Sequence, residues 1–336
     1  MKFYFLNSII SQILERCYLM SHFTVLVIGK DVEKQLEPYA EQDFDSKYGV
    51  FESKEEEYRT EYENDTMEAV AFDGQIFSIY DSQFSNYSGL SNERKYPANA
   101  VLKTVPMKEV YATFEDYLVG WHGVHGPDEE TGQYGYWTNP NAQWDWYVIG
   151  GRWTGYFKPK LGSAGALGQS GTFDNKPLEG WVDQINYGDV DFDGMKAHEA
   201  KEAHALYDKI EGILKGREIP SWEKIRESHP DDIQAARDEY HAHPVMKDFR
   251  AAEFHYFGDM EEEFGGGREA YVRKCTNRTA VPYAVLKDGK WYQKGEMGWF
   301  GMSSDNMTQE EWNDEFWKLL ESLDDDTLLT LVDCHI

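Results

Sequence analysis

Apolar and polar positions follow clear periods at the two ends of the chain. The run "HFTVLVIG" (22–29) is short and rich in β-branched residues, which predicts a buried strand, and "KDVEKQLEPYAE" after it predicts a helix. Near the other end, Thr308 and Glu311 form a capping box that predicts a helix over "TQEEWNDEFWKLLESL". The apolar stripe of this helix consists of Trp312, Phe316, Leu319, Leu320 and Leu323. "TLLTLVDCHI" then predicts a closing strand.

The order of these elements predicts the fold class. "AVLKDGKWYQKG" (284–295) predicts a hairpin around Asp288-Gly289. A strand and helix at the start and a helix and strand at the end suggest that the two terminal strands lie in one sheet. We therefore expect an α+β protein with a mainly antiparallel sheet, formed by the N- and C-terminal segments, and a helical insertion.

The insertion is expected between residues 161 and 269. Residues 161–193 are rich in Gly, Ser and turn formers and predict a long surface excursion. Helical spacing follows over 195–216, which Gly216 ends as a C-cap, and again near 221–228 and 230–241. The α+β core would then comprise residues 20–160 and 270–336.

Residues 1–19 are expected to be an N-terminal extension. They are apolar but interrupted by Asn and Ser, and they lack the small-residue cleavage site of a signal peptide. Met20 directly precedes the first strand pattern, which favours an upstream start codon as their origin. An amphipathic helix built from Phe5, Ile9, Ile13 and Leu14 is the alternative.

The stretch "YGYWTNPNAQWDWYVIGGRWTGYF" (134–157) predicts a second hairpin. Gly150-Gly151 suits a two-residue primed turn, which needs positive φ at both positions. Counting outward from this turn gives one apolar face and one amphipathic face. The predicted apolar pairs are Val148 with Trp153, Trp146 with Gly155 and Trp144 with Phe157. The predicted amphipathic pairs are Ile149 with Arg152, Tyr147 with Thr154 and Asp145 with Tyr156.

The amphipathic face is our first candidate for ligand or partner binding. Arg and Asp alternate there with tyrosines, as they do at many binding surfaces, although an ordinary solvated sheet face has the same pattern. The candidate residues are Asp145, Tyr147, Arg152 and Tyr156. His122 and His125 of "WHGVHG" join them, because they could form a site with an acid of "PDEE"; solvated turn histidines are the alternative.

Tests for known cofactor and metal motifs give one weak match. "DVDFDG" supplies Asp189, Asp191 and Asp193 as in a calcium loop, but the twelfth position holds Ala200 in place of a glutamate. Asp193 as the N-cap of the following helix explains the same residues. The histidines of "HEAKEAH" are six apart and point to different helix faces, and "GSAGALGQSG" lacks the ending of a phosphate-binding loop. We predict no cofactor, and no other metal site.

Net charge narrows the choice of partner. Lys and Arg total 33 against 61 Asp and Glu, a formal charge of −28. This charge repels nucleic-acid phosphates and attracts basic protein surfaces, although it could also serve solubility alone. Three widely separated cysteines (Cys17, Cys275 and Cys334) indicate a reducing compartment. The chain lacks an apolar run of about 18 residues, so we expect no membrane association.

The segments "YGYWTNPNAQWDWYVIGGRW", "DGKWYQKGEMGWFG" and "TLLTLVDCHI" resemble a family of uncharacterised proteins of bacteriophages and prophages. The resemblance covers both ends of residues 21–336 and implies an accessory protein in the cytoplasm of the bacterial host. We expect a non-enzymatic binder that antagonises a host protein with a basic surface, such as a nuclease complex. The alternative is an enzyme or sequestering protein for an anionic or nucleotide-like ligand, with its site near residues 145–156. The sequence leaves homo-oligomerisation open.

Overall fold

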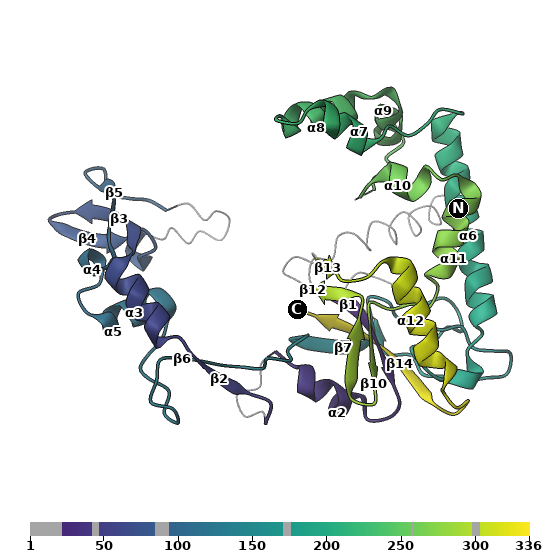
Figure 1. Cartoon of the computed structure of the whole chain (residues 1–336), viewed down its shortest axis with the longest axis horizontal. Helices are drawn as coiled ribbons and strands as arrows, with labels where there is room; N and C mark the ends of the chain where they lie inside the picture. Colours follow the sequence, from purple (N-terminus) through teal and green to yellow (C-terminus); the bar gives the residue numbers. More distant parts are fainter. Residues whose placement is uncertain (1–21, 42–46, 85–93, 171–175, 257, 298–302) are drawn as a thin grey trace. The chain divides into compact units, whose positions relative to one another are not determined.

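The computed structural model of the chain describes residues 22–41, 47–84, 94–170, 176–256, 258–297 and 303–336 (Figure 1). The expectations for residues 1–19 lie outside this part. The chain forms two compact units. The described residues up to Ala40 and residues Gln143–Ile336 make the first unit, and Glu41–Ala142 make the second. This division differs from the expected one, which placed residues 41–142 inside the core.

A seven-stranded sheet organises the first unit, and it confirms the α+β class. β1 (His22–Ile28) pairs antiparallel with β14 (Leu328–His335), so the two terminal strands lie in one sheet as predicted. β10 (Ala284–Lys287) pairs with β1 in parallel, and β7 (Trp146–Gly151) pairs antiparallel with β14. The other strands of the sheet are β8 (Gln169–Ser170), β9 (Gln184–Asn186) and β11 (Lys290–Gln293).

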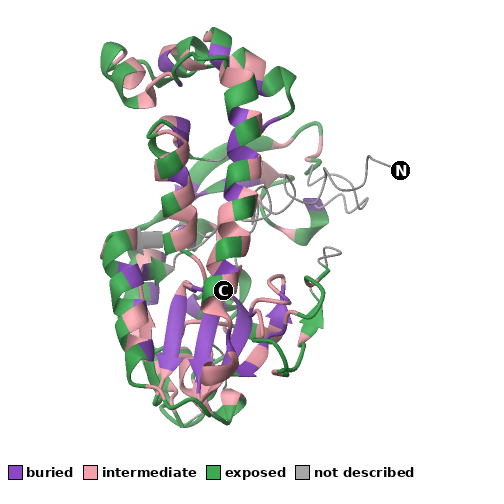
Figure 2. Cartoon of the chain, turned by 90° about the vertical axis from the view of Figure 1, so that its right-hand side faces the viewer, coloured by how far each residue is buried: buried purple, intermediate pink, exposed green. Residues whose placement is uncertain are grey.

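Both faces of this sheet are buried, and its central strands are shown as buried in Figure 2. α12 (Gln309–Glu321) covers one face with Trp312, Phe316 and Leu320, each of which stabilises the fold by about 1.5–3 kcal/mol through burial. The Thr308–Glu311 capping box predicted for this helix is present. α2 (Val32–Leu36) and the 3-10 turn η1 (Glu37–Tyr39) cover the other face, where Leu36 is fully buried.

The hairpin predicted at Asp288-Gly289 is confirmed. β10 and β11 are antiparallel, and both turn residues have positive φ (53° and 70°), as a primed turn requires. A short ribbon follows it, formed by β12 (Gly295–Met297) and β13 (Ser303–Asp305).

A helical region of the first unit surrounds a separate apolar cluster that includes Leu206, Ile210, Phe249 and Phe264. Its longest helix begins three residues earlier than predicted, because the side chain of Asp191 caps it. The helices near 221–228 and 230–241 are also present. The helices are α6 (Phe192–Leu214), α7 (Trp222–Ser228), α8 (Ile233–Ala242), α9 (Pro244–Ala251), α10 (Met260–Phe264) and α11 (Arg268–Asn277).

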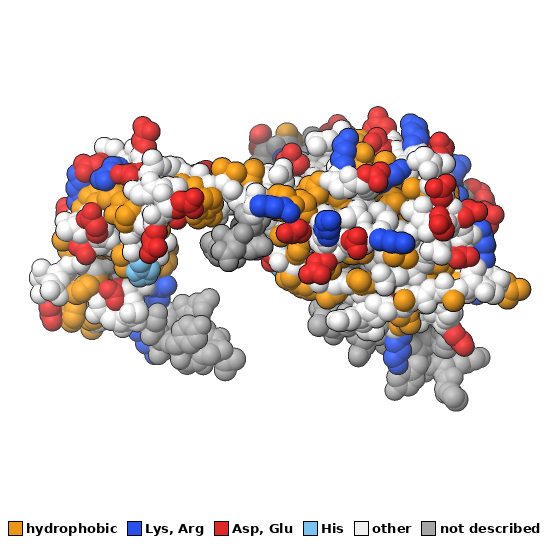
Figure 3. Space-filling model, turned by 90° about the horizontal axis from the view of Figure 1, so that it is seen from below, with side chains coloured by type: hydrophobic (Ala, Val, Ile, Leu, Met, Phe, Trp, Pro, Cys, Tyr) orange, Lys and Arg blue, Asp and Glu red, His pale blue; other side chains and the backbone are white. Residues whose placement is uncertain are grey.

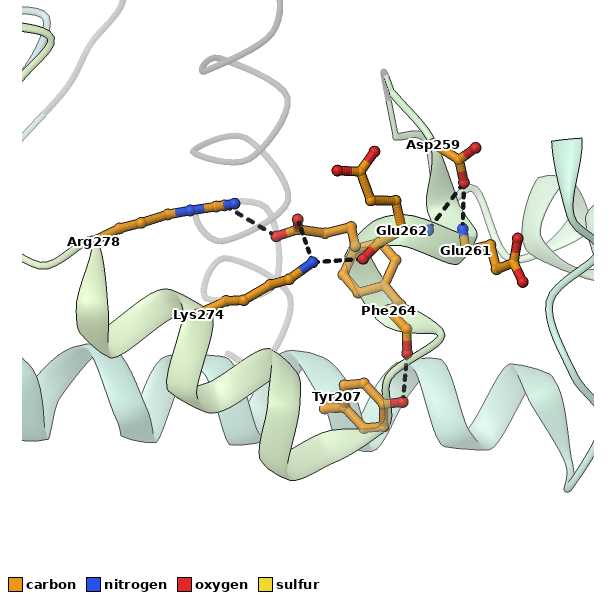
Figure 4. A network of polar contacts seen from close by, with 8 residues as sticks. Tyr207, Asp259, Glu261, Glu262, Phe264, Lys274 and Arg278 are labelled. Atoms are coloured by element: carbon orange, nitrogen blue, oxygen red, sulfur yellow. Dashed lines mark hydrogen bonds and ion pairs between the residues drawn. The ribbon is translucent and has the colours of Figure 1, made fainter. Parts of the chain in front are cut away.

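Polar contacts fasten the short helix α10 to its neighbours (Figure 4). Lys274 of α11 and Arg278, the residue directly after this helix, form ion pairs with Glu263, and the Tyr207 hydroxyl of α6 donates to the Phe264 carbonyl (2.9 Å). Asp259 accepts from the first two backbone N–H groups that follow Met260. A helix of five residues is unstable alone, so these contacts and the burial of Phe264 hold it in place.

The second unit contains two small antiparallel sheets and short helices. β3 lies between β4 and β5, and β2 pairs with β6. Tyr58, Tyr62 and Tyr117 are buried in its apolar cluster. The strands are β2 (Val50–Ser53), β3 (Thr66–Phe72), β4 (Gln75–Ser78), β5 (Val101–Pro106) and β6 (Gly135–Thr138). The helices are α3 (Glu55–Asn64), α4 (Met107–Val110) and α5 (Phe114–Tyr117), with the 3-10 turn η2 (Ser82–Phe84) and the π-helical turn η3 (Leu118–His122).

The hairpin predicted at Gly150-Gly151 is wrong. Both glycines have positive φ (80° and 55°), but they end strand β7, whose partners are β14 and β8. Part of the predicted surface excursion is buried as well: Val182 and Ile185 pack in the core, and β9 pairs with β14. The 3-10 turn η4 (Tyr187–Asp189) follows β9. Within the described ranges, every helix is too short or too polar to span a bilayer.

Candidate functional site

Three aromatic rings meet at one end of the sheet in the first unit. They belong to His22 of β1, Trp146 of β7 and His335 of β14, which lie side by side in the strand register. The His22 ring stands edge-on to Trp146 (centroids 4.9 Å apart) and to His335 (4.8 Å). The rings of His335 and Trp146 are stacked at 5.1 Å. We call these three residues the ring cluster.

An aspartate orients each histidine of the ring cluster. Nδ1 of His22 lies 2.7 Å from Oδ1 of Asp333, and Nδ1 of His335 lies 2.7 Å from Oδ1 of Asp145. The Asp333 side chain is 2% exposed and the His22 side chain 7%, whereas His335 and Asp145 are 26% and 34% exposed. An ionised carboxylate only accepts hydrogen bonds, so this geometry favours the tautomer with the proton on Nδ1 in both histidines. Nε2 is then the nitrogen that can take up a proton.

The register of β14 explains why these polar groups gather here. Side chains alternate between the two faces of a strand, so Leu329, Leu331, Asp333 and His335 share one face. Leu329 and Leu331 pack in the core under α12, and Asp333 and His335 lie at the end of the sheet. Cys334 points to the opposite face and is buried, and this burial raises the pKa of its thiol. It is therefore an apolar core residue.

The double glycine packs against two buried aspartates. The second oxygen of Asp333 accepts from the backbone N–H of Arg152 (2.8 Å), and a Cβ on Gly151 would lie 2.7 Å from Asp333 Cγ. A Cβ on Gly150 would lie 2.9 Å from Cγ of Asp183. Asp183 is fully buried, and it accepts from the Thr154 hydroxyl and from the backbone N–H groups of Gly155, Tyr156 and Gly168. These two carboxylates fix the path of the chain between β7 and Phe157.

The predicted amphipathic face is not formed as expected. Tyr147 opposes Cys334 and packs against Trp144 on the far face of the sheet, where burial raises its pKa. Tyr156 contacts Phe157 and the core beneath α12. Asp145 and Arg152 each take part in one of the two aspartate–histidine pairs: Asp145 is itself the partner of His335, and the Arg152 backbone N–H donates to Asp333, the partner of His22.

The interior and surface assignments of the tryptophans also change. Trp146 was predicted to be buried and is 43% exposed. Trp144 is half-buried and donates from its indole nitrogen to the Leu36 carbonyl (3.2 Å), and Trp153 is half-buried against the core. The prediction failed because the chain turns after Gly151 and β14 inserts beside β7, so that residues 153–157 do not form its partner strand.

His122 and His125 belong to the second unit, which is described by itself. His122 Nε2 lies 2.7 Å from the Tyr117 hydroxyl and 3.1 Å from Glu61 Oε2. The indole nitrogen of Trp121 donates to the other oxygen of Glu61 (3.0 Å), and the Tyr58 ring lies 4.3 Å from the His122 ring. Burial raises the pKa of Tyr117 well above its ordinary value, so this hydroxyl stays protonated. His122 is thus part of a packed tyrosine–histidine–glutamate network.

Two hollows lie on the second unit. The first, of about 220 Å³, is lined by apolar residues that include Leu118, Val119 and Val124, with Glu115 and His125 beside them. The second, of about 280 Å³, is lined by Phe77, Tyr80, Asp81 and Tyr111 among others. The π-helical turn η3 contributes to both, through Leu118 and Val119 on one side and Gly120 on the other.

The aspartates of the calcium-like loop serve other roles. Asp191 caps α6 and forms an ion pair with Lys158 (2.7 Å), which lowers its pKa, and Asp189 accepts from the Ser163 hydroxyl (2.7 Å). Asp193 is exposed in the first turn of α6 and is not its N-cap, which corrects our alternative. Within the described ranges, no three His, Cys, Asp or Glu side chains are arranged to hold a metal ion.

Reasoning from sequence missed His22, Asp183, Asp333 and the role of His335. A local signal existed for two of them: His22 begins the first strand pattern and His335 nearly ends the last, so antiparallel pairing of these strands brings them together. Asp183 had no signal, since it lies in a segment expected to be a surface loop.

Comparison of the chain with protein-family models, with curated proteins and with solved structures gave no match.

Proposed function

We propose that the protein is a phage accessory protein that binds a host protein with a basic surface, and that the second unit is the binding element. The observation that carries this proposal is the charge of that unit. Residues 41–142 contain 20 Asp and Glu against 7 Lys and Arg, a formal charge of −13. A charge of this density attracts basic surfaces and speeds their encounter at low ionic strength.

Exposed apolar side chains accompany these charges. The described part of this unit exposes Val50 (54%), Tyr80 (59%), Val101 (60%), Leu102 (61%), Val119 (45%) and Tyr136 (45%). Figure 3 shows carboxylate and apolar side chains next to one another on the face of the unit in view, at the left. Protein interfaces combine apolar and aromatic contacts with a charged rim, so this mixture supports protein binding.

Helix α3 carries part of this charge on an exposed surface. Its buried side holds Tyr58 and Tyr62, and its exposed side carries Glu56, Glu57 and Glu63.

The salt dependence of binding tests the proposal. The tagged full chain is used to isolate a partner from bacterial lysate, and its affinity for the purified partner is measured at several salt concentrations. We expect binding that weakens steeply with salt. Binding that does not change with ionic strength would count against the proposal.

A second candidate function is an acid–base site for an anionic small molecule at the ring cluster. The observation that favours it is that His22 and His335 lie 4.8 Å apart, each with Nδ1 held by an aspartate. Protonated imidazoles bind anions, and neutral ones accept protons through Nε2. Titration with inorganic phosphate tests it: saturable shifts of the imidazole resonances, lost in His335→Ala, would support this function, and unchanged spectra would exclude it.

A further inference from the structure

We infer that the hollow between Phe77, Tyr80, Asp81 and Tyr111 receives one arginine side chain of the basic partner. This inference rests on the proposed function and names the group that the second unit recognises. The volume of the hollow, about 280 Å³, is at the low end of the range that is common for ligand sites, about 300–1,000 Å³. It is large enough for a single arginine side chain.

The walls of the hollow match the chemistry of a guanidinium group. Its lining includes Tyr80 and Tyr111, which carry aromatic rings and hydroxyl groups, and Asp81, which carries a carboxylate. A planar cation stacks on aromatic rings and donates to carboxylates at the same time, which an apolar side chain cannot do. Lysine fits less well, because its ammonium group is compact and more strongly hydrated.

The ring of Tyr80 already binds a guanidinium group of this chain. The Arg94 guanidinium lies 4.7 Å from the ring centroid, and its Nη1 donates to the Ile79 carbonyl (2.6 Å). Tyr80 thus already stacks on one guanidinium group, and the same residue lines the hollow. The Trp121 ring packs beside Tyr80 with ring centroids 5.9 Å apart and supports it from outside the hollow.

Packing holds the ring of Tyr111 in position. A Cβ on Gly120 would lie 2.6 Å from the Tyr111 ring, so this ring rests directly on the backbone of η3. Burial raises the pKa of the Tyr111 hydroxyl, and although a hydrogen bond with Ser78 opposes this, the nearby Asp81 carboxylate adds to the rise, so the hydroxyl stays protonated. The Asp81 side chain accepts from the Gln83 N–H (3.0 Å), which orients its carboxylate.

The test uses the full chain and an acetylated, amidated hexa-arginine peptide as the probe, with hexalysine and hexanorleucine for comparison. We expect hexa-arginine to bind most tightly. Tyr80→Ala should weaken its binding by about threefold to tenfold through the lost cation–π contact, and Tyr80→Phe should keep most of it. Asp81→Asn should weaken it by about twofold to fivefold. Glu129→Gln removes one exposed charge of the same unit outside the hollow, and should change affinity by less than about twofold.

The outcomes separate this inference from the function on which it rests. Salt-sensitive binding of hexa-arginine that Tyr80→Ala and Asp81→Asn leave unchanged would overturn the arginine hollow and leave the acidic surface in place. Equal loss of hexanorleucine binding in Tyr80→Ala would assign the hollow to an apolar side chain and also overturn the inference. The absence of any salt-sensitive binding would overturn the proposed function itself. Circular dichroism of each variant excludes unfolding as the cause.

Discussion

The backbone of Gly151 lies directly against the carboxylate of Asp333, so close that a Cβ on this glycine would come within 2.7 Å of Asp333 Cγ. Gly150 stands in the same relation to Asp183. Two constraints therefore favour glycine at both positions: an aspartate side chain lies too close for a Cβ, and the backbone φ is positive. Through Asp333, this contact links the strand end of β7 to His22 and the ring cluster.

We expect Gly151→Ala to lower the free energy of unfolding by more than the cost of placing alanine in a left-handed conformation. The left-handed conformation costs a non-glycine residue about 1–2 kcal/mol, and overlap with the buried Asp333 adds about 1–3 kcal/mol. Gly162→Ala is the matched control, because Gly162 also has positive φ (88°) but, among the described residues other than its chain neighbours, no atom lies within 4 Å of its added Cβ. Urea unfolding of both variants measures the difference. Equal losses would show that Asp333 does not crowd this position.

His22 and His335 are expected to carry their protons on Nδ1 at neutral pH. Each Nδ1 faces a carboxylate oxygen at 2.7 Å, and an ionised carboxylate accepts hydrogen bonds but cannot donate them. Long-range nitrogen–proton NMR of the imidazole rings identifies this tautomer directly. Asp145→Asn should weaken the preference for this tautomer at His335 alone, because Asp333 still accepts from Nδ1 of His22. Finding the proton on Nε2 in both rings would contradict the arrangement.

Removal of residues 41–142 should leave the first unit folded. The two chain ends at this junction already touch: the Gln143 N–H donates to the Tyr39 carbonyl (2.8 Å), and Ala40 forms a β-bridge with Trp144. A short Gly-Ser linker can join them with little strain. We expect cooperative unfolding and an amide spectrum that matches the first unit in the full chain. A shortened chain that fails to fold would show that the second unit is required for the core.

Acid should weaken the loop before β6 at a pH below the ordinary pKa of an aspartate. The Thr131 N–H and the indole N–H of Trp137 (2.9 Å) donate to Asp128 and lower its pKa from 3.8. A lowered folded-state pKa means that this contribution is present above about pH 4 and is lost as pH falls through the lowered value. The Trp137 indole resonance should report a midpoint below 3.8, and Asp128→Asn should abolish the transition. A midpoint above 3.8 would contradict the contact.

Local sequence patterns were sufficient to predict the elements that are set by neighbouring residues or by a strong hydrophobic period. The capping box at Thr308, the Asp288-Gly289 turn and the two terminal strands are all confirmed, because caps, turns and β-branched runs act over a few residues. The same reasoning failed at Gly150-Gly151. Positive φ was predicted correctly there, but a primed turn and a packed strand end both need it, and local pattern cannot distinguish them.

The candidate site shows the same limit. Its residues come from three strands and from positions as far apart as His22 and His335, and only long-range pairing brings them together. Asp145 and Arg152 were found because the aromatic motif around them stood out. Asp183 and Asp333 were missed because a buried aspartate is identified by its donors, which lie 15 to 29 residues away for Asp183 and at least 181 residues away for Asp333.

Charge reversal on the second unit tests the central claim most directly. The triple variant Glu56→Lys, Glu57→Lys and Glu63→Lys changes exposed residues of α3, and Glu223→Lys, Glu227→Lys and Asp231→Lys change the charge equally at exposed positions of the first unit. The affinity of the full chain for its basic partner is measured for both variants. We predict a loss of at least about tenfold for the α3 variant and less than about threefold for the other. Equal effects of the two variants, or no effect of either, would contradict the account.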